Sequence, residues 1–176
     1  MGWVDQVPGA GKLYIGGLYG LYQTDLISAA GITHVLSAID YDPLLQQHFS
    51  HLKHFHVRVD DDPNQDLLQY FDAGSRYIDE GISSGGGVFV HCAMGKSRSA
   101  TFVVAYLMWK CGVTWERGLD MLCKGRPVCD PNVGFKEQLG VWQEMLMVGR
   151  KERREAIYKR WLEERFTGEP WEWEER

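Results

Sequence analysis

The chain has 176 residues, 44% of them hydrophobic and 24% charged, which is typical of one globular domain with a substantial core. Its net charge of −5 argues against a general nucleic-acid binder, because such proteins carry a basic excess. No apolar run reaches the length of a membrane span, and residues 1–12 lack a signal-peptide pattern, so we expect no membrane association. Four cysteines in unpatterned spacing predict free thiols in a reducing compartment.

In chain order, the first predicted elements are a short strand at residues 13–15, followed by a Gly-Gly turn, and a helix at residues 25–30 that ends at Gly31. A run rich in β-branched residues predicts a buried strand at residues 32–39. Residues 55–59 (FHVRV) alternate as a strand does and lead into the acidic turn DDDP. The first third of the chain therefore predicts strands separated by a helix and ending in an acidic loop.

The middle of the chain continues this alternation. Apolar residues near helical spacing predict a helix at residues 67–82, and a Gly-rich breaker then precedes a buried strand at residues 88–90. Residues 99–109 are apolar nearly all round, so we expect a central helix there. Further helices are predicted at residues 114–123 and 134–148. Strands alternating with helices predict an α/β fold with a central, mostly parallel sheet flanked by helices.

Beyond the last of these helices the composition changes to a charged stretch, RKERREAIYKRWLEERF, and then to the acidic-aromatic end GEPWEWEER. We predict a terminal amphipathic helix followed by a frayed tail. Ile157, Trp161 and Phe166 lie at roughly helical spacing, which favours packing against the core, with partner docking as the alternative. The predicted organisation is a globular domain over residues 1–149 and a helical extension with its tail over residues 150–176.

The segment VFVHCAMGKSRS places a cysteine between a predicted buried strand and the predicted central helix. Cys92 then lies at the carboxyl end of a strand, with a helix N-terminus directed at the loop, which is where α/β proteins bind anions. The five residues between Cys92 and Arg98 can curl so that backbone N–H groups point inward and form a nest for a tetrahedral dianion. Gly95 supplies the backbone freedom for this curl, and Arg98 can close over a phosphate with two parallel hydrogen bonds.

The same dipoles favour a thiolate, so we expect the pKa of Cys92 to lie below its free value of about 8.5. A thiolate at phosphate distance is a nucleophile for in-line displacement and gives a phosphocysteine. The alternative is that Cys92 is simply a buried core cysteine. That interpretation gives no role to His91, Gly95 and Arg98, which lie at fixed distances from it along the sequence. The predicted phosphate-binding loop consists of His91, Ala93, Met94, Gly95, Lys96 and Ser97.

HCAMGKSRS resembles the HCxxGxxRS signature of the dual-specificity phosphatases, a branch of the cysteine-dependent protein tyrosine phosphatases. Residues 126–139 (RPVCDPNVGFKEQL) are similar to the family's RPxxxPNxGFxxQL stretch, and LYIGG and ITHVL resemble its amino-terminal strands. The resemblance covers residues 13–148. It implies the dual-specificity phosphatase fold for residues 1–149. It also implies hydrolysis of phosphotyrosine and phosphoserine or phosphothreonine in protein substrates through a phosphocysteine, with no cofactor and no metal.

The leaving group needs a proton from a neighbouring loop, and VRVDDDP offers three carboxyl groups. In the family one spacer residue separates the strand from the acid, which implies Asp60 as the spacer and Asp61 as the general acid, and the alternative is a solvated turn residue. We expect Ser99 to hydrogen-bond the Cys92 sulfur and to help expel the thiolate in the second step. The resemblance implies that His91 and Asn132 brace the loop, and a helix N-cap alone is the alternative role for Asn132.

Other signals are weaker. Four histidines between residues 48 and 56 have spacings that suit a metal, but no cysteine or carboxylate accompanies them, and the other cysteines lack CxxC pairing, so we predict no metal site. Lys96 adds a positive charge at the mouth of the predicted pocket, so more acidic substrates such as phosphoinositides remain an alternative to phosphoproteins. The chain is too short for the long recognition loop that deepens the pocket of tyrosine-specific relatives, so we expect a shallow pocket that admits phosphoserine and phosphothreonine.

VDDDPNQDLLQYFD, AYLMWKCG and IYKRWLEERF resemble the phosphatase domain of the branch called dual-specificity phosphatase twelve. That branch implies a role in assembly of the large ribosomal subunit in nucleus and cytoplasm, with pre-ribosomal particles as partners besides phosphorylated proteins. Its members carry a cysteine-rich zinc domain after the phosphatase domain, which could carry the ribosomal role. The alternative function is therefore a docking module with incidental catalysis. The presence of Cys92, Arg98 and Asp61 together favours the enzyme.

Overall fold

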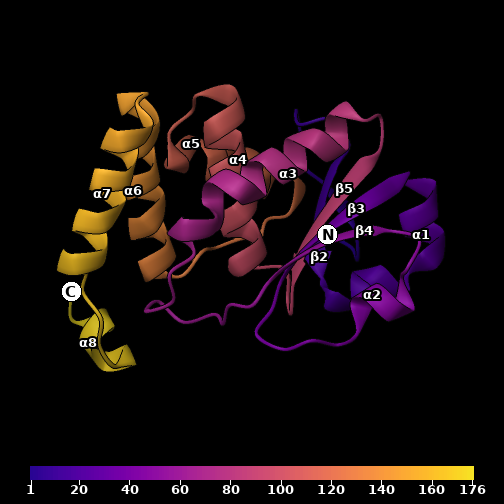
Figure 1. Cartoon of the computed structure of the whole chain (residues 1–176). Coiled ribbons are helices and arrows are strands. Elements are labelled where there is room, and N and C mark those ends of the chain that lie inside the picture. The colour runs from indigo at the N-terminus through magenta and orange to yellow at the C-terminus, as the bar shows by residue number, and fades with distance from the viewer.

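A five-stranded sheet forms the centre of the computed structural model, which describes residues 1–176 (Figure 1). In spatial order the strands are β1 (Asp5–Gln6), β2 (Leu13–Gly17), β5 (Gly87–Cys92), β3 (Ile32–Ala38) and β4 (Lys53–Val57). Only β1 is antiparallel to its neighbour, and all other adjacent strands are parallel. The predicted α/β fold with a mostly parallel sheet is confirmed, and β5 occupies the middle of the sheet.

Helices cover both faces of this sheet (Figure 1). On one side lie α1 (Thr24–Ala29) and α2 (Leu45–His48), together with the 3₁₀ segment η1 (Leu18–Tyr22). On the other side lie η2 (Leu68–Tyr70), α3 (Phe71–Ser83), α4 (Arg98–Cys111), α5 (Trp115–Gly125) and α6 (Val133–Val148). The chain ends with α7 (Lys151–Glu164), which packs on α6, and with α8 (Pro170–Glu174). None of these helices combines the length and the apolar character that a bilayer crossing requires.

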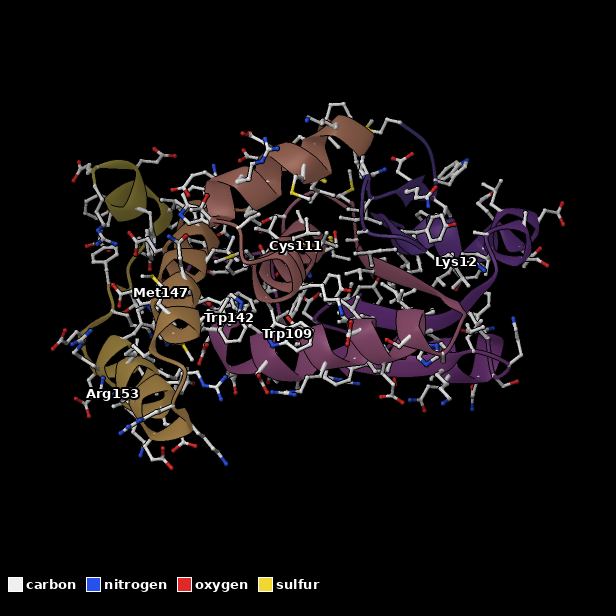
Figure 2. All side chains as sticks on the ribbon, turned by 90° about the horizontal axis from the view of Figure 1, so that it is seen from above. Lys12, Trp109, Cys111, Trp142, Met147 and Arg153 are labelled. Atoms are coloured by element: carbon white, nitrogen blue, oxygen red, sulfur yellow. The ribbon has the colours of Figure 1, made fainter.

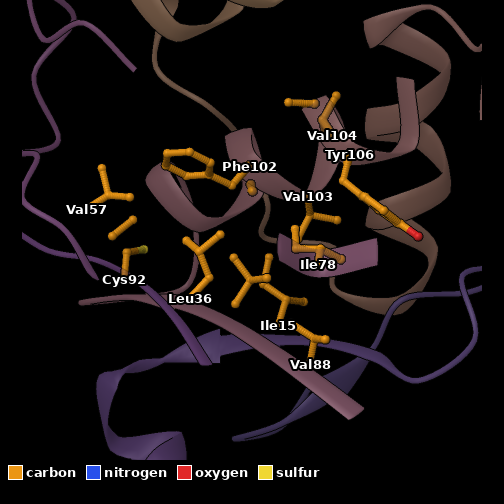
Figure 3. Packing of buried hydrophobic residues seen from close by; sticks show 14 of the residues in the cluster. Ile15, Leu36, Val57, Ile78, Val88, Cys92, Phe102, Val103, Val104 and Tyr106 are labelled. Atoms are coloured by element: carbon orange, nitrogen blue, oxygen red, sulfur yellow. The ribbon is translucent and has the colours of Figure 1, made fainter. Parts of the chain in front are cut away.

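The predicted central helix is α4, whose residues from Arg98 to Met108 are all buried. Its side chains lie between the sheet and the helices outside it, and Figure 3 shows Phe102 and Val103 of α4 above the sheet residues Leu36 and Ile15. Figure 3 also shows Cys92 at the edge of this cluster, on the side of Leu36. Burial of apolar surface on this scale holds the strand and the helix that flank the candidate site in fixed positions.

Further from the sheet, Trp142 connects α6 to the core. Its indole N–H donates to the carbonyl of Ala105 in α4 at 3.1 Å, and its ring meets Phe71 edge-on at 5.9 Å. Seen from above in Figure 2, α7 lies on the outer side of α6, and Arg153 of α7 points away from the core. The layers therefore run from the sheet through α4 and α6 to α7.

Three predicted boundaries are wrong. The Gly-Gly turn predicted after residues 13–15 is instead the end of β2, because Gly16 and Gly17 pair with His91 and Cys92 of β5. The strand predicted at residues 55–59 is β4, at Lys53–Val57, because the N–H of Val59 turns back to the carbonyl of Val57 at 3.1 Å and the chain leaves the ladder there. The helix predicted from residue 67 begins as a 3₁₀ turn and becomes α-helical only at Phe71. The side chain of Gln138 on α6 accepts hydrogen bonds from the N–H groups of residues 67 and 68, which fixes this entry turn.

The prediction of a frayed tail is also wrong. Residues beyond α7 form a turn and the helix α8, and Trp173 in α8 is only 6% exposed. The ring of Phe166 meets Trp173 edge-on at 4.8 Å, and the guanidinium of Arg176 lies over both rings. Glu169 and Glu172 form a reciprocal capping box that starts the helix. An acidic-aromatic composition therefore forms an ordered end here because its aromatic rings pack together.

Candidate active site

The loop between β5 and α4 lies at the carboxyl end of the middle strand of the sheet. Strand β5 ends at Cys92, α4 begins at Arg98, and β2 runs parallel beside β5 so that Gly17 is the partner of Cys92. Gly95 has a φ of +68°, and a Cβ there would lie 2.4 Å from the carbonyl carbon of Gly16. Glycine is therefore required at position 95 both for its left-handed backbone and for the close approach of β2.

The carbonyl groups of this loop point outward. The carbonyl oxygens of residues 93–96 all accept hydrogen bonds from outside the loop, from the backbone N–H groups of Leu18 and Asp130 at 3.1 and 2.8 Å and from the guanidinium of Arg126 at 2.8 and 3.1 Å. In a trans peptide the N–H points opposite to the C=O, so the following N–H groups point inward. This geometry is a nest of the kind that accommodates a tetrahedral anion.

Cys92 lies at the floor of the nest and is 2% exposed. Its Sγ is 3.2 Å from the N–H of Gly95 and 3.2 Å from the hydroxyl of Ser99. Burial raises the pKa of the thiol, but hydrogen bonds from Ser99 and from the backbone N–H of Lys96, together with the Arg98 charge, outweigh it and leave the pKa of Cys92 below its usual value. The arrangement favours a thiolate. All four cysteines of the chain are free thiols.

Arg98 is buried beside the loop, at 7% exposure. One terminal nitrogen donates to the carbonyl of Val59 at 3.0 Å and lies 3.6 Å from a carboxylate oxygen of Asp40. Its buried Nε has no hydrogen-bond partner in the protein. A buried N–H without a partner is costly, and a phosphate oxygen is the acceptor that would satisfy it while the guanidinium stays anchored at its other end.

His91 lies under the loop and is fully buried. Its Nε2 is 2.6 Å from the hydroxyl of Ser37 and its Nδ1 is 3.1 Å from the carbonyl of Cys92. Burial, together with the nearby charges of His54, His56 and Arg98, lowers the pKa of His91 to about 4, so the ring is neutral near pH 7. A neutral ring with Nδ1–H donating to the carbonyl and Nε2 accepting from the serine satisfies both contacts. His91 therefore holds the peptide that carries the candidate nucleophile.

Asp61 lies on the exposed loop after β4. Its carboxylate accepts a hydrogen bond from the side-chain amide of Asn132 at 3.0 Å, and its backbone N–H donates to Asp60 at 2.7 Å. Asn132 also donates its backbone N–H to the hydroxyl of Ser97 in the phosphate-binding loop at 3.0 Å, and its side-chain oxygen caps α6 at Phe135 at 2.9 Å. The structure thus connects Asp61 to the phosphate-binding loop through one asparagine.

Sequence reasoning missed Arg126 as a site residue. It is 6% exposed, and besides its bonds to the loop carbonyls it donates to the carboxylate of Asp5 at 2.7 Å and to the carbonyl of Gly2 at 2.9 Å. The available signal was its place at the start of the RPxxxPN stretch. Asp40, 3.6 Å from Arg98, carried no signal of its own.

Two predicted residues of the loop, Met94 and Lys96, lie at its rim, whereas Ser97 is buried. Met94 is 77% exposed and Lys96 is exposed as well, so both side chains face solvent. In the histidine-rich region, Nε2 of His54 and Nε2 of His56 face the backbone carbonyls of Phe49 and Ile39 at 2.8 and 3.1 Å. The structure has no group of three or more metal-binding side chains.

Comparisons with known proteins identify the family of this chain. The family model described as the dual specificity phosphatase catalytic domain matches residues 13–145. Dual specificity protein phosphatase 1 of Arabidopsis thaliana is 38% identical over 136 residues, which cover 77% of this chain and 68% of that protein. Tyrosine-protein phosphatase YVH1 of Saccharomyces cerevisiae is 32% identical over 157 residues, with 77% of this chain and 42% of YVH1 covered.

Among solved structures, the Yvh1 phosphatase domain from Chaetomium thermophilum superposes with a TM-score of 0.75 at 35% identity, covering 84% of this chain and 99% of that domain. This identity falls between those of the two relatives above. The comparisons therefore support the family as a whole and do not favour the YVH1-type branch over its other members.

Proposed function

Because the chain belongs to the dual-specificity phosphatase family, and so is a hydrolase that acts on phosphotyrosine and on phosphoserine or phosphothreonine, we propose that it works through a phosphocysteine formed on Cys92. The observation that carries this proposal is the position of the Cys92 sulfur. It lies 3.2 Å from an inward N–H and 3.2 Å from the Ser99 hydroxyl, at the floor of a nest beside an Arg98 Nε without a partner.

In the first step the Cys92 thiolate attacks phosphorus and the bond to the leaving oxygen breaks. The nest and Arg98 hold the non-bridging oxygens, where negative charge gathers in the transition state. Asp61 gives its proton to the leaving oxygen, which departs as the free hydroxyl of the substrate. The sulfur–phosphorus bond replaces the oxygen–phosphorus bond, so the phosphoryl group is conserved on the enzyme.

In the second step a water molecule attacks the phosphocysteine. Asp61, now a carboxylate, takes the proton of the water, and the sulfur–phosphorus bond breaks to release phosphate and the Cys92 thiolate. The Ser99 hydroxyl donates to the departing sulfur, which makes the thiolate a better leaving group. Asp61 acts as acid and then as base and ends in its starting state.

The test is to trap the intermediate. Wild-type protein mixed with a ³²P-labelled phosphopeptide and quenched in acid should retain label on Cys92, and Cys92→Ser should turn over no aryl phosphate. Cys129→Ser is the matched control, because this second buried cysteine has a pKa raised by burial to about 12 and should leave labelling unchanged. Turnover of Cys92→Ser within tenfold of wild type would mean that another group is the nucleophile.

We propose further that residues 1–149 form the phosphatase domain and residues 150–176 a helical extension of it, as the change in composition after α6 suggests.

We also propose a role in large ribosomal subunit assembly, in nucleus and cytoplasm. What supports it is the resemblance of VDDDPNQDLLQYFD and IYKRWLEERF to the dual-specificity phosphatase twelve branch. Cells that lack the protein should accumulate immature large-subunit particles. Rescue by Cys92→Ser would assign the task to docking, and failure of that rescue would assign it to catalysis.

A further inference from the structure

The chain beyond α7 meets the loop that carries Asp61, and the contacts converge on Asn64. The side-chain amide of Asn64 donates to the carbonyl of Gly168 at 2.8 Å, and its side-chain oxygen accepts from the N–H of Gly168 at 3.0 Å and from the indole N–H of Trp173 at 2.9 Å. Arg165 donates to the carbonyl of Asn64 at 3.0 Å. Residues 165–176, which we term the C-terminal clamp, thus bind both the side chain and the backbone of Asn64.

Asn64 lies three residues after Asp61, on the same irregular loop. Within this loop the hydrogen bonds are local: the backbone N–H of Asn64 donates to Asp62 at 2.8 Å, and that of Asp60 donates to Gln65 at 3.2 Å. Local bonds shape the loop but do not fix it against the rest of the molecule. Its position must come from contacts with other elements.

On one side those contacts come from α6. The amide of Asn132 donates to Asp61, and the side chain of Gln138 donates to the carbonyl of Gln65 at 2.8 Å. Gly134 touches Pro63 so closely that a Cβ at position 134 would lie 2.1 Å from the Pro63 carbonyl oxygen. The C-terminal clamp provides the other side, so residues 60–65, which we term the acid loop, are held between α6 and the clamp.

The clamp is itself anchored. Arg176 forms an ion pair with Glu137 of α6 at 3.0 Å and covers the packed rings of Phe166 and Trp173. Tyr158 of α7 donates to the carboxylate of Asp66 at 2.5 Å, just beyond the clamped segment of the acid loop. A rigid clamp fixed to α6 can transmit a fixed position to Asn64 and through it to Asp61.

We propose that the C-terminal clamp is a positioning element for catalysis, which holds the Asp61 carboxyl where it can protonate the leaving group. This rests on the proposed role of Asp61 as the general acid. A carboxyl group displaced by about 1 Å from its productive position loses as much as a hundredfold in rate. A clamp that merely stabilised the fold would affect all substrates equally, whereas a clamp that positions the acid affects most the substrates that need a proton.

The test uses point variants of the full chain and two aryl phosphates. Phenyl phosphate has a poor leaving group, whereas p-nitrophenyl phosphate has a good one that needs little protonation. Trp173→Ala should lower kcat/KM for phenyl phosphate by about tenfold to a hundredfold, with a loss at least about threefold smaller for p-nitrophenyl phosphate. Trp173→Phe, which removes the indole N–H donor but keeps a smaller aromatic ring at this position, should lose about three- to tenfold in kcat/KM with phenyl phosphate, roughly the equivalent of one hydrogen bond.

Met147→Ala is the control, because this large apolar side chain on α6 lies outside the clamp, is 81% exposed and should leave both substrates unaffected. All assays are run at a temperature at which circular dichroism shows the variants folded, and Trp173→Phe decides the question if Trp173→Ala does not fold. In an Asp61→Asn background, Trp173→Phe should cost nothing further, because the group that it positions is gone.

Equal losses with the two substrates, or no loss with phenyl phosphate in Trp173→Phe, would overturn the positioning role. So would a loss that persists undiminished in the Asp61→Asn background. The single variant Asp61→Asn separates this failure from that of the proposed function. If it turned over phenyl phosphate as wild type does, the assignment of the acid itself would be wrong, and the clamp proposal would fall with it.

Discussion

Arg126 should be essential to the phosphate-binding loop although it lies outside it. It is the one side chain that bonds two successive carbonyl groups of the loop, those of Met94 and Gly95, while its other end is fixed by Asp5. We consider two replacements. Arg126→Met removes all of these bonds, whereas Arg126→Lys keeps a charge that can still pair with Asp5 but cannot bridge two carbonyls in a plane.

The magnitudes follow from burial and from the number of bonds lost. The Arg126 and Asp5 side chains are 7% and 14% exposed, so Arg126→Met leaves a largely buried carboxylate unpaired and should lower the free energy of unfolding by about 3–5 kcal/mol. Arg126→Lys loses the two loop bonds, each of about 1.5–3 kcal/mol for a charged donor and partly replaced by the ammonium, so about 2–4 kcal/mol should be lost. The free energy of unfolding of a domain is typically about 5–15 kcal/mol, which exceeds this loss, so Arg126→Lys should remain folded.

Urea unfolding measures the stability of the variants, and kcat/KM for p-nitrophenyl phosphate measures whether the loop still supports catalysis. In Arg126→Lys the loop amides are no longer held in place, so kcat/KM should fall on the order of a hundredfold while the protein stays folded. Lys110→Met is the control, because the Lys110–Asp79 pair is partly exposed and should contribute at most about 1 kcal/mol without affecting activity. Activity of Arg126→Lys within threefold of wild type would refute the idea that outward fixation of the carbonyls creates the nest.

Two further predictions concern the loop itself. Because the pKa of Cys92 is lowered, the rate of its alkylation by iodoacetate should rise with pH at lower pH values than for a free thiol. Ser99→Ala removes a hydrogen bond to the thiolate and should move this pH curve to higher pH. An unmoved curve would exclude Ser99 from thiolate stabilisation. Gly95→Ala should be inactive, because its Cβ would meet the Gly16 backbone. Gly112→Ala is the control: Gly112 has a φ of +67° but no atom within 4 Å of an added Cβ, so this variant should lose about 1–2 kcal/mol of stability and keep its activity. Equal activities of the two variants would show that the loop tolerates displacement of β2.

The parts of the site that sequence could predict are those encoded by local spacing. Cys92, Gly95, Arg98 and Ser99 lie within eight consecutive residues between a strand and a helix, and backbone geometry leaves such a short segment few ways to close. The apolar content of residues 99–109 likewise determines a buried helix without reference to the rest of the chain.

The parts that sequence could not predict depend on contacts between distant segments. Arg126 meets Asp5 across 121 residues, and Asn64 meets Trp173 across 109, and no periodicity in either segment announces the partner. The acidic-aromatic tail has the composition of a solvated end, but it is ordered by its own packed rings and by Asn64 in a distant loop, a partner that composition does not indicate. The end of β4 depends on distant contacts as well. Val59 continues the alternating pattern, but its N–H donates to the carbonyl of Val57 and its own carbonyl accepts a hydrogen bond from Arg98.

Asn132 shows how two roles that sequence weighs as alternatives can be one. An asparagine side chain has an acceptor oxygen and a donor amide, and the two ends point in different directions. In this structure the oxygen caps α6 at Phe135, which fixes the side-chain torsion and thereby aims the amide at Asp61. The backbone N–H of the same residue holds Ser97. Through this cap, the start of α6 holds the acid loop and the phosphate-binding loop in fixed positions relative to each other. Aspartate could not replace Asn132, because an aspartate side chain can cap the helix but has no amide to donate to Asp61.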